Sequence, residues 1–235
     1  GANNVAVGSL SLTSNSTGAQ NVAVGREALD ANTTANNNSA VGDSALGSNT
    51  TGANNTSLGA AALFSNTTAS NNTAVGKDAL QLNTTGTQNT SVGALSLDAN
   101  TTGSQNTACG EGALSSNTTA SNNVGIGFQA LVINTTGSEC TAVGTNALDA
   151  NTTATNNTAV GYLALTSTQT GASNTAVGRS SLANNTASNN TAVGNSAMLA
   201  NTTGTANTAM GAEALDANTT GNFNDAFGKG ALSAN

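Results

Sequence analysis

The chain has 235 residues, of which 2% are aromatic and 6% charged, and it contains neither proline nor histidine. Its formal net charge of −7 includes only four basic residues, which provide no basic patch for nucleic acid or for an anionic membrane surface. The lack of histidine excludes the common catalytic triads and most metal sites, and no apolar run approaches the ~20 residues of a membrane span. We therefore expect no enzymatic activity, no cofactor, no metal site, and no membrane insertion within this segment.

One glycine recurs along the whole chain, from Gly8 to Gly228. Gly25 follows Gly8 by 17 residues, and each later step is also 17 except for one of 16 between Gly178 and Gly194. Each repeat glycine ends a copy of Asn-Thr-Ala-Val-Gly and is followed by x-x-Ala-Leu-x-x-Asn-Thr-Thr-Gly. A short fixed period indicates a solenoid, in which each coil contacts only its neighbours. Positions within a coil are numbered here from the repeat glycine, which is position 0.

The pattern predicts an all-β fold, a parallel β-roll or β-solenoid of about fourteen 17-residue coils. Each coil is expected to contain two short strands with the glycine as a turn between them, and a loop of Asn-Thr-Thr-Gly closes the circuit. Stacked at about 4.7 Å per coil, this segment would be roughly 65 Å long. The chain begins and ends inside a repeat, so we expect residues 1–235 to form a single continuous array, an uncapped segment of a longer solenoid.

Asparagine occupies position −4 in every coil except one, where Cys140 replaces it. Identical polar side chains stacked along the axis can bond to one another, as asparagine ladders do in cross-β stacks. We expect such a ladder at this position, represented by Asn21, Asn72 and Asn106.

Two columns are consistently large and apolar, position −1 (mostly Val) and position +4 (Leu, or Met198). They are five residues apart and would point to opposite faces of one unbroken strand. A glycine with positive φ between them can turn the chain so that both point inward. The predicted core is therefore made of both columns, for example Val7, Leu12, Val24, Leu29, Val41, Leu46, Val75, Leu80, Val143 and Leu148.

Positions −2 and +3 beside these columns are Ala, or otherwise Ser or Gly. If their large neighbours point inward, these small residues point outward, where their restricted size suggests the close approach of another backbone. The hypothesis is lateral packing against identical chains, with a trimer about the long axis favoured. The alternative is that alanine merely suits the curvature of the strand.

Threonine recurs at position +9 and is expected to form a second polar ladder, represented by Thr34, Thr85 and Thr136. Asn-Thr-Thr is also an acceptor sequence for N-linked glycans, although asparagine and threonine are equally natural residues of a tight loop. The possible glycosylation sites are Asn32, Asn49, Asn66, Asn83, Asn100, Asn117, Asn134, Asn151, Asn201 and Asn218.

The remaining reactive side chains give no sign of a catalytic site. The carboxylates fall among the variable positions and are interpreted as solvated surface. Cys109 and Cys140 lie two coils apart, about 9 Å, which is too far for a disulfide, so both are expected to be free thiols. Phe128 and Tyr162, directly after a repeat glycine, are the first places to look for a contact site.

The motif Asn-Thr-Ala-Val-Gly-x-x-Ala-Leu resembles the small-Ala-Ile/Val-Gly-x-x-Ala head repeat of trimeric autotransporter adhesins, and also repeats of phage tail-fibre and bacterial surface fibre proteins. The resemblance implies a left-handed parallel β-roll that is trimeric and extracellular and that binds matrix, host or neighbouring cells. The period is longer here because of the Asn-Thr-Thr-Gly segment, so the trimer and the handedness do not follow directly.

The leading functional interpretation is an extracellular or cell-surface fibrous protein, structural or adhesive, that forms a rigid rod or filament by stacking and self-association. Its expected partners are further copies of itself, laterally and end to end, and a host, matrix or cell-surface ligand. The first alternative is an ice-binding solenoid that uses the threonine column. The second is a receptor-binding tail fibre of a phage, which shares the same physics.

Overall fold

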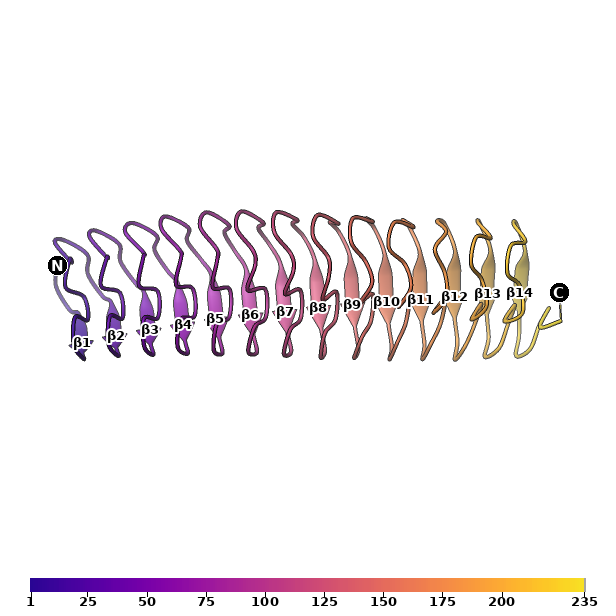
Figure 1. The fold of residues 1–235 in the computed structure, drawn as a ribbon, viewed down its shortest axis with the longest axis horizontal. Coiled ribbons are helices and arrows are strands. Elements are labelled where there is room, and N and C mark those ends of the chain that lie inside the picture. Colours follow the sequence, from indigo (N-terminus) through magenta and orange to yellow (C-terminus); the bar gives the residue numbers. More distant parts are fainter. Residues whose placement is uncertain (235) are drawn as a thin grey trace. The chain divides into compact units, whose positions relative to one another are not determined.

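The computed structural model describes residues 1–234, which contain fourteen β-strands and no helix. The chain divides into two compact units, Gly1–Ser121 and Asn122–Asn235. Each unit is a parallel β-solenoid in which successive coils stack with their strands on the same side (Figure 1). The prediction of an all-β parallel solenoid with coils about seventeen residues apart is confirmed.

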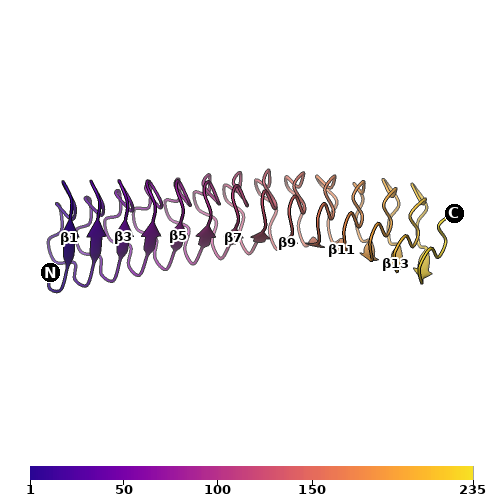
Figure 2. The ribbon, with the colours of Figure 1, turned by 90° about the horizontal axis from the view of Figure 1, so that it is seen from below.

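Every coil contributes one strand of three residues, and within each unit the strands pair in the order of the sequence. In the first unit the strands are β1 Val5–Val7, β2 Val22–Val24, β3 Ser39–Val41, β4 Thr56–Leu58, β5 Thr73–Val75, β6 Thr90–Val92 and β7 Thr107–Cys109. In the second unit they are β8 Val124–Ile126, β9 Thr141–Val143, β10 Thr158–Val160, β11 Thr175–Val177, β12 Thr191–Val193, β13 Thr208–Met210 and β14 Asp225–Phe227. Within each unit the strands run parallel, side by side (Figure 2).

The register of the sheet places equivalent residues next to one another. Val24 of β2 pairs with Val41 of β3, for example. The 16-residue coil does not disturb this register, because Thr175 of β11 still pairs with Thr191 of β12. The residue missing from that coil is therefore absorbed in its loop.

The prediction of a second strand in each coil, around Ala-Leu, is wrong. Glu27 and Leu29 have positive φ values of 55° and 51°, so the chain turns here instead of extending. The turn still takes part in stacking, because the Leu29 amide donates to the Ala45 carbonyl of the next coil at 3.1 Å. Axial hydrogen bonding thus continues outside the strand.

The predicted glycine pivot is confirmed. Gly144, for example, has a φ of +133°, and a Cβ built on it would lie 2.6 Å from the carbonyl oxygen of Gly161 in the next coil. The position requires glycine both for its backbone conformation and because the neighbouring backbone leaves no space for a side chain.

The interior is narrow and holds one large apolar side chain per coil. Leu29 at position +4 is completely buried, and so are the small residues Ala23 at position −2 and Ala28 at position +3. The leucine half of the predicted core is therefore confirmed. The expectation that the alanine columns face outward is wrong, because they line the interior instead.

The asparagine column at position −4 forms the expected ladder. The Asn21 side chain is buried, its Nδ2 donates to the Ala35 carbonyl at 2.8 Å, and its Oδ1 accepts the backbone amide of Asn38 at 3.0 Å. Asn72 is buried with the same pattern of bonds, and Asn106 is buried with its Nδ2 donating to the Ala120 carbonyl and its backbone amide donating to the Oδ1 of Asn89. The ladder satisfies buried backbone groups of the loop, which would otherwise cost about 1–3 kcal/mol each.

A second asparagine ladder runs through position +7, which is the first residue of each Asn-Thr-Thr segment. The Nδ2 of Asn66 donates to the Oδ1 of Asn49 in the preceding coil at 2.9 Å and to the Ala69 carbonyl of its own loop at 3.0 Å. Both of its N–H groups are therefore used inside the solenoid.

Candidate functional surface

Position −1, called here the valine column, lies on the outside of the solenoid. Val7 is 57% exposed and Val41 is 37% exposed, while Val24, Val75 and Val143 are half-buried. The valine half of the predicted core is therefore wrong. The complete column is Val7, Val24, Val41, Leu58, Val75, Val92, Cys109, Ile126, Val143, Val160, Val177, Val193, Met210 and Phe227.

Alternation along the strand explains why the column faces outward. Successive side chains of a strand point to opposite sides. Asn21 and Ala23 share the inner side and are buried, so Val22 and Val24 share the outer side. The pivot at Gly25 then turns the chain so that Leu29 enters the interior. A large side chain at position +4 leaves space only for a small residue at position −2, which is alanine, serine or glycine.

The outer face of each sheet carries two side-chain rows, the valine column and position −3 next to it. Position −3 is threonine over the runs Thr56, Thr73, Thr90, Thr107 in the first unit and Thr141, Thr158, Thr175, Thr191, Thr208 in the second. The two rows contain no charged residue before Asp225. We call this surface, positions −3 and −1 together, the strand face.

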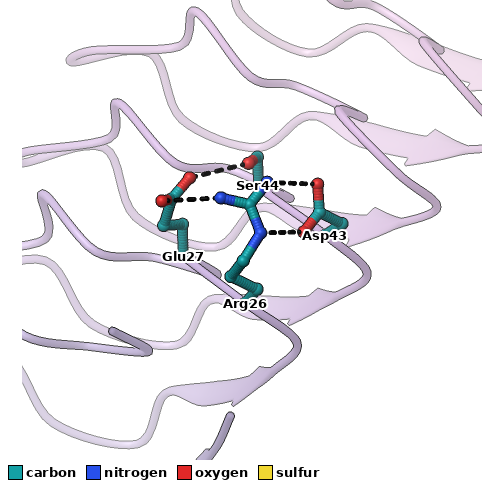
Figure 3. A network of polar contacts seen from close by, with 4 residues as sticks. All are labelled: Arg26, Glu27, Asp43 and Ser44. Atoms are coloured by element: carbon teal, nitrogen blue, oxygen red, sulfur yellow. Dashed lines mark hydrogen bonds and ion pairs between the residues drawn. The ribbon is translucent and has the colours of Figure 1, made fainter. Parts of the chain in front are cut away.

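Most of the charged side chains lie instead on the turn that follows the repeat glycine, with Glu139 and Asp225 as exceptions. The Arg26 guanidinium donates to both carboxylate oxygens of Asp43 in the next coil, at 2.8 and 2.9 Å, and lies 2.7 Å from Glu27. Ser44 completes this network by donating to Glu27 at 3.2 Å (Figure 3). The hydrogen bond to Asp43 and its charge raise the pKa of Arg26. Because all of these groups are at least partly exposed, the network adds little to stability.

The turn residues vary from coil to coil, which distinguishes them from the strand face. Position +1 is Arg26, Asp43 and Ala60 in three successive coils, and Phe128 and Tyr162 occupy it elsewhere, 45% and 48% exposed. The valine column is apolar in all fourteen coils, although its side chains are exposed or half-buried. This contrast makes the strand face the candidate contact surface.

The predicted glycosylation sites are all inside the solenoid. The ten asparagines Asn32, Asn49, Asn66, Asn83, Asn100, Asn117, Asn134, Asn151, Asn201 and Asn218 belong to the ladder at position +7 and are at most 4% exposed. A glycan on Nδ2 would have no space and would remove a ladder hydrogen bond. These residues are therefore not glycan acceptors in the folded chain, and the row of glycans considered from the sequence is corrected.

The threonine ladder is displaced by one residue from its expected place. Thr34, Thr85 and Thr136 at position +9 are exposed at the apex of their loops. The hydroxyl groups that bond between coils belong to position +8 instead, as where Thr33 donates to the Thr50 carbonyl at 3.1 Å. The 16-residue coil keeps this bond, since Thr186 donates to Thr202 at 2.9 Å, and it lacks only the outer threonine.

The two cysteines are free thiols, as expected. Cys109 lies exposed in the valine column, so its interpretation as a core residue is wrong. Cys140 replaces asparagine in the ladder at position −4, where it is buried and its Sγ lies 3.4 Å from the Ala154 carbonyl. Burial raises the pKa of the Cys140 thiol.

The described part of the chain contains no cluster of metal-ligating side chains. Residues 1–234 contain no group of three or more His, Cys, Asp or Glu side chains that could hold a metal ion. They also contain no helix that is long and apolar enough to span a membrane. Burial raises the pKa of Asp98, whose Oδ1 is enclosed without a hydrogen-bond partner, but no second titratable group faces it at bonding distance.

Comparison with known proteins adds no assignment. No protein-family model, no curated protein and no solved structure matches the chain. Function is therefore argued from the strand face alone.

Proposed function

We propose that the chain is part of an extracellular or cell-surface fibre whose strand face packs against identical chains. The observation that carries the proposal is the valine column, which is apolar in all fourteen coils and accessible in the single chain. The fibre acts as a stiff structural or adhesive element. In this respect it is similar to the head domains of trimeric autotransporter adhesins, whose three-chain assembly is the arrangement we favour.

The partner most compatible with this face is a second copy of the chain. The column repeats at about 4.7 Å within each unit, and only another parallel solenoid presents an apolar group at the same spacing over many coils. The face also carries no charge before Asp225, so two copies do not repel each other. The sequence interpretation assigned lateral packing to the alanine columns, and the proposal transfers it to the valine column.

The energetics favour association only for a long array. Covering the exposed part of one valine gains roughly 0.5–1 kcal/mol, so fourteen coils would gain roughly 7–14 kcal/mol. Association itself costs about 4–15 kcal/mol. A few coils therefore cannot offset the cost of association, whereas fourteen coils gain an amount in the same range as this cost and a longer array gains more.

The test is the mass of the chain in solution. Sedimentation velocity and equilibrium are expected to give three chains per particle, and negative-stain microscopy is expected to show thin fibres. A triple variant with Val41, Val75 and Val160 changed to threonine keeps the β-branched shape and is expected to weaken association. The matched control changes Thr34, Thr85 and Thr136 on the loop apex to serine and should leave the mass unchanged. Monomers of the parent at high concentration would refute the proposal.

Adhesion is tested separately with the assembled fibre. Beads coated with the chain are expected to bind extracellular matrix or cells. Phe128 and Tyr162, on the variable turn, are the first candidates for direct contact, and changing both to serine is expected to reduce bead binding without changing the sedimentation mass. Assembly without binding to any such surface would restrict the function to a structural filament, as would be the case for the shaft of a phage tail fibre.

Ice binding is a second candidate, favoured by the in-register rows of threonine and valine on the strand face. The threonine column first considered for ice binding, position +9, lies at the apex of the loops, and the 16-residue coil has no threonine there. Position −3 offers a more regular array, as in the run from Thr141 to Thr208. Ice binding needs this face free, whereas lateral packing covers it. Inhibition of ice recrystallisation by a monomeric chain would therefore favour this alternative, and a negative assay would eliminate it.

A further inference from the structure

The ladder at position +7 is interrupted at one coil of the second unit. In the coil before it, the Nδ2 of Asn151 donates to the Oδ1 of Asn134 at 2.7 Å and to the Ala154 carbonyl at 3.2 Å. The next coil has Thr168 in place of asparagine, and this threonine is completely buried. The donor that should reach Asn151 from the next coil is therefore missing.

The hydroxyl group of Thr168 cannot replace that donor. A hydroxyl has one hydrogen, and Thr168 donates it to the Asn185 carbonyl in the opposite direction along the axis, at 2.7 Å. The Oδ1 of Asn151 is consequently buried without a partner. A buried acceptor of this kind costs about as much as a lost hydrogen bond unless something else donates to it.

A second hydrogen-bond acceptor in the coil that contains Thr168 also has one donor fewer than its equivalents in regular coils. In regular coils the carbonyl at position +10 accepts two side-chain amides, as Gly52 does from Asn38 and from Asn49, both at 2.9 Å. At the interrupted rung the equivalent carbonyl, that of Gly171, accepts from Asn157 at 2.7 Å. Its second bond in a regular coil would come from an asparagine at position 168.

The turn that leads into Thr168 has the same backbone bond as in a regular coil. The Thr168 amide donates to the Leu165 carbonyl at 3.3 Å, close to the 3.1 Å of the equivalent bond from Asn151 to Leu148. Strands β9, β10 and β11 on either side remain in register. The threonine side chain occupies the position of the asparagine, but its hydroxyl group bonds to the Asn185 carbonyl and leaves Asn151 Oδ1 without a donor.

We propose that one water molecule is bound at this rung in place of the missing amide nitrogen. Its two hydrogens match the two acceptors, the Oδ1 of Asn151 and the second lone pair of the Gly171 carbonyl. Buried waters are held by two to four polar groups of this type. The site is internal and does not depend on the proposed assembly of the fibre, so it can be tested whether or not that proposal holds.

The direct test is a crystal structure of the full chain at a resolution that orders water. The parent is expected to show one water within hydrogen-bond distance of both Asn151 Oδ1 and Gly171 O. The Thr168→Asn variant is expected to show the asparagine amide nitrogen there and no water. Absence of density between the two acceptors in the parent would overturn the proposal.

Stability provides the second readout. Replacing the water by a covalently attached amide releases the water and keeps both of its hydrogen bonds, but it removes the hydroxyl donation from Thr168 to the Asn185 carbonyl. Because these effects oppose each other, Thr168→Asn is expected to change the unfolding equilibrium constant by less than about tenfold. The matched control, Asn66→Thr in the first unit, makes the same defect in a regular rung and should raise the unfolding constant. A Thr168→Asn variant whose unfolding equilibrium constant is about a hundredfold or more lower than that of the parent would contradict the proposal, because a gain of that size is expected only where the two acceptors have no donor in the parent.

Discussion

Asn49 donates from its Nδ2 to the Oδ1 of Asn32, 3.2 Å away in the preceding coil, although each of the two residues begins a glycan acceptor sequence. The Asn49 amide uses both of its N–H groups in the ladder, because the second one reaches the loop carbonyl of Gly52 at 2.9 Å. The same atoms cannot serve as glycan acceptors and as ladder donors. This conflict determines the first prediction.

The folded chain is expected to resist N-glycosylation, and the unfolded chain is expected to accept it. Purified folded and denatured samples are incubated with an oligosaccharyltransferase and its lipid-linked donor, and intact mass is measured. The folded sample should keep the mass of the bare polypeptide, because its acceptor asparagines are at most 4% exposed. A folded sample that gains glycan mass at several sites would show that the ladder opens readily.

Removing one ladder amide is expected to destabilise the solenoid. Asn83→Ala deletes the donors to Asn66 Oδ1 and to the Gly86 carbonyl, at 3.0 and 2.9 Å. Leaving buried acceptors without donors should cost roughly 2–4 kcal/mol, measured by urea unfolding. The control is Thr85→Ala, two residues away and exposed, which should change stability by less than about 0.5 kcal/mol. Equal effects of the two changes would contradict the buried ladder.

Leu97 and Val92 belong to the same coil, in which Leu97 lies in the interior and Val92 lies on the outer surface. Leu97 is fully buried and Val92 is 37% exposed. Leu97→Ala is therefore expected to cost about 2–5 kcal/mol, and Val92→Ala much less, when both are measured on dissociated chains at low concentration. If Val92→Ala were as costly as Leu97→Ala under these conditions, the outward placement of the valine column would be wrong.

The repeat glycine is expected to tolerate no side chain. Gly144→Ala combines a φ of +133° with a Cβ that meets the Gly161 carbonyl oxygen at 2.6 Å. We expect a loss of more than about 3 kcal/mol in thermal or chemical unfolding. The control is Gly47→Ala, at a position without positive φ, where the nearest atom to the new Cβ is in the exposed Phe64 ring at 3.3 Å. This variant should lose much less.

How far the sequence predicts the fold depends on which relationship is considered. The period and the pivot glycines, such as Gly144, predict the stacked coils because they require no knowledge of what fills the interior. The direction in which the side chains of the strand point does require this knowledge. An inward valine with an outward alanine fits the alternation as well as the reverse arrangement does. The ladder could have decided the question: Asn21 and Ala23 are two residues apart and share a face, so an inward asparagine places Val24 outside.

The candidate surface was predictable only in part. From the sequence, lateral packing is assigned to the alanine columns at positions −2 and +3, but these residues line the interior. The accessible column is the valine column, which is assigned to the core from the sequence. The second ladder was missed because Asn32 and its equivalents were considered as loop or glycan residues. Their near-invariance over the coils, with Thr168 the exception, was the available signal.

Lowering the pH is expected to stabilise the folded chain through the partly buried carboxyl group of Asp98. Burial raises the pKa of Asp98 above its ordinary value of 3.8, against the opposing hydrogen bonds of the backbone amides. The folded chain thus binds this proton more tightly than the unfolded chain, and the stability gained is present below the ordinary pKa and is lost as the pH rises through the raised one. At neutral pH the buried charge is destabilising.

The Asp98→Asn variant tests this sign. It should be more stable than the parent at neutral pH, and the difference should shrink as the pH falls toward about 4. Urea unfolding of both chains over this range provides the measurement. A difference that stays constant with pH, or that grows on acidification, would show that the carboxylate is not the group responsible.

The shortened loop has a practical consequence for protein engineering. Between Thr186 and Ala187 the chain omits a residue, yet the hydroxyl bond to Thr202 and the pairing of β11 with β12 are kept. Loop apices therefore tolerate changes in length, and each is a natural insertion point for a displayed epitope or an affinity tag. Insertions at successive loop apices would form a row with a spacing of about 4.7 Å. Insertion at only every fourth or fifth coil would separate bulky inserted segments sufficiently.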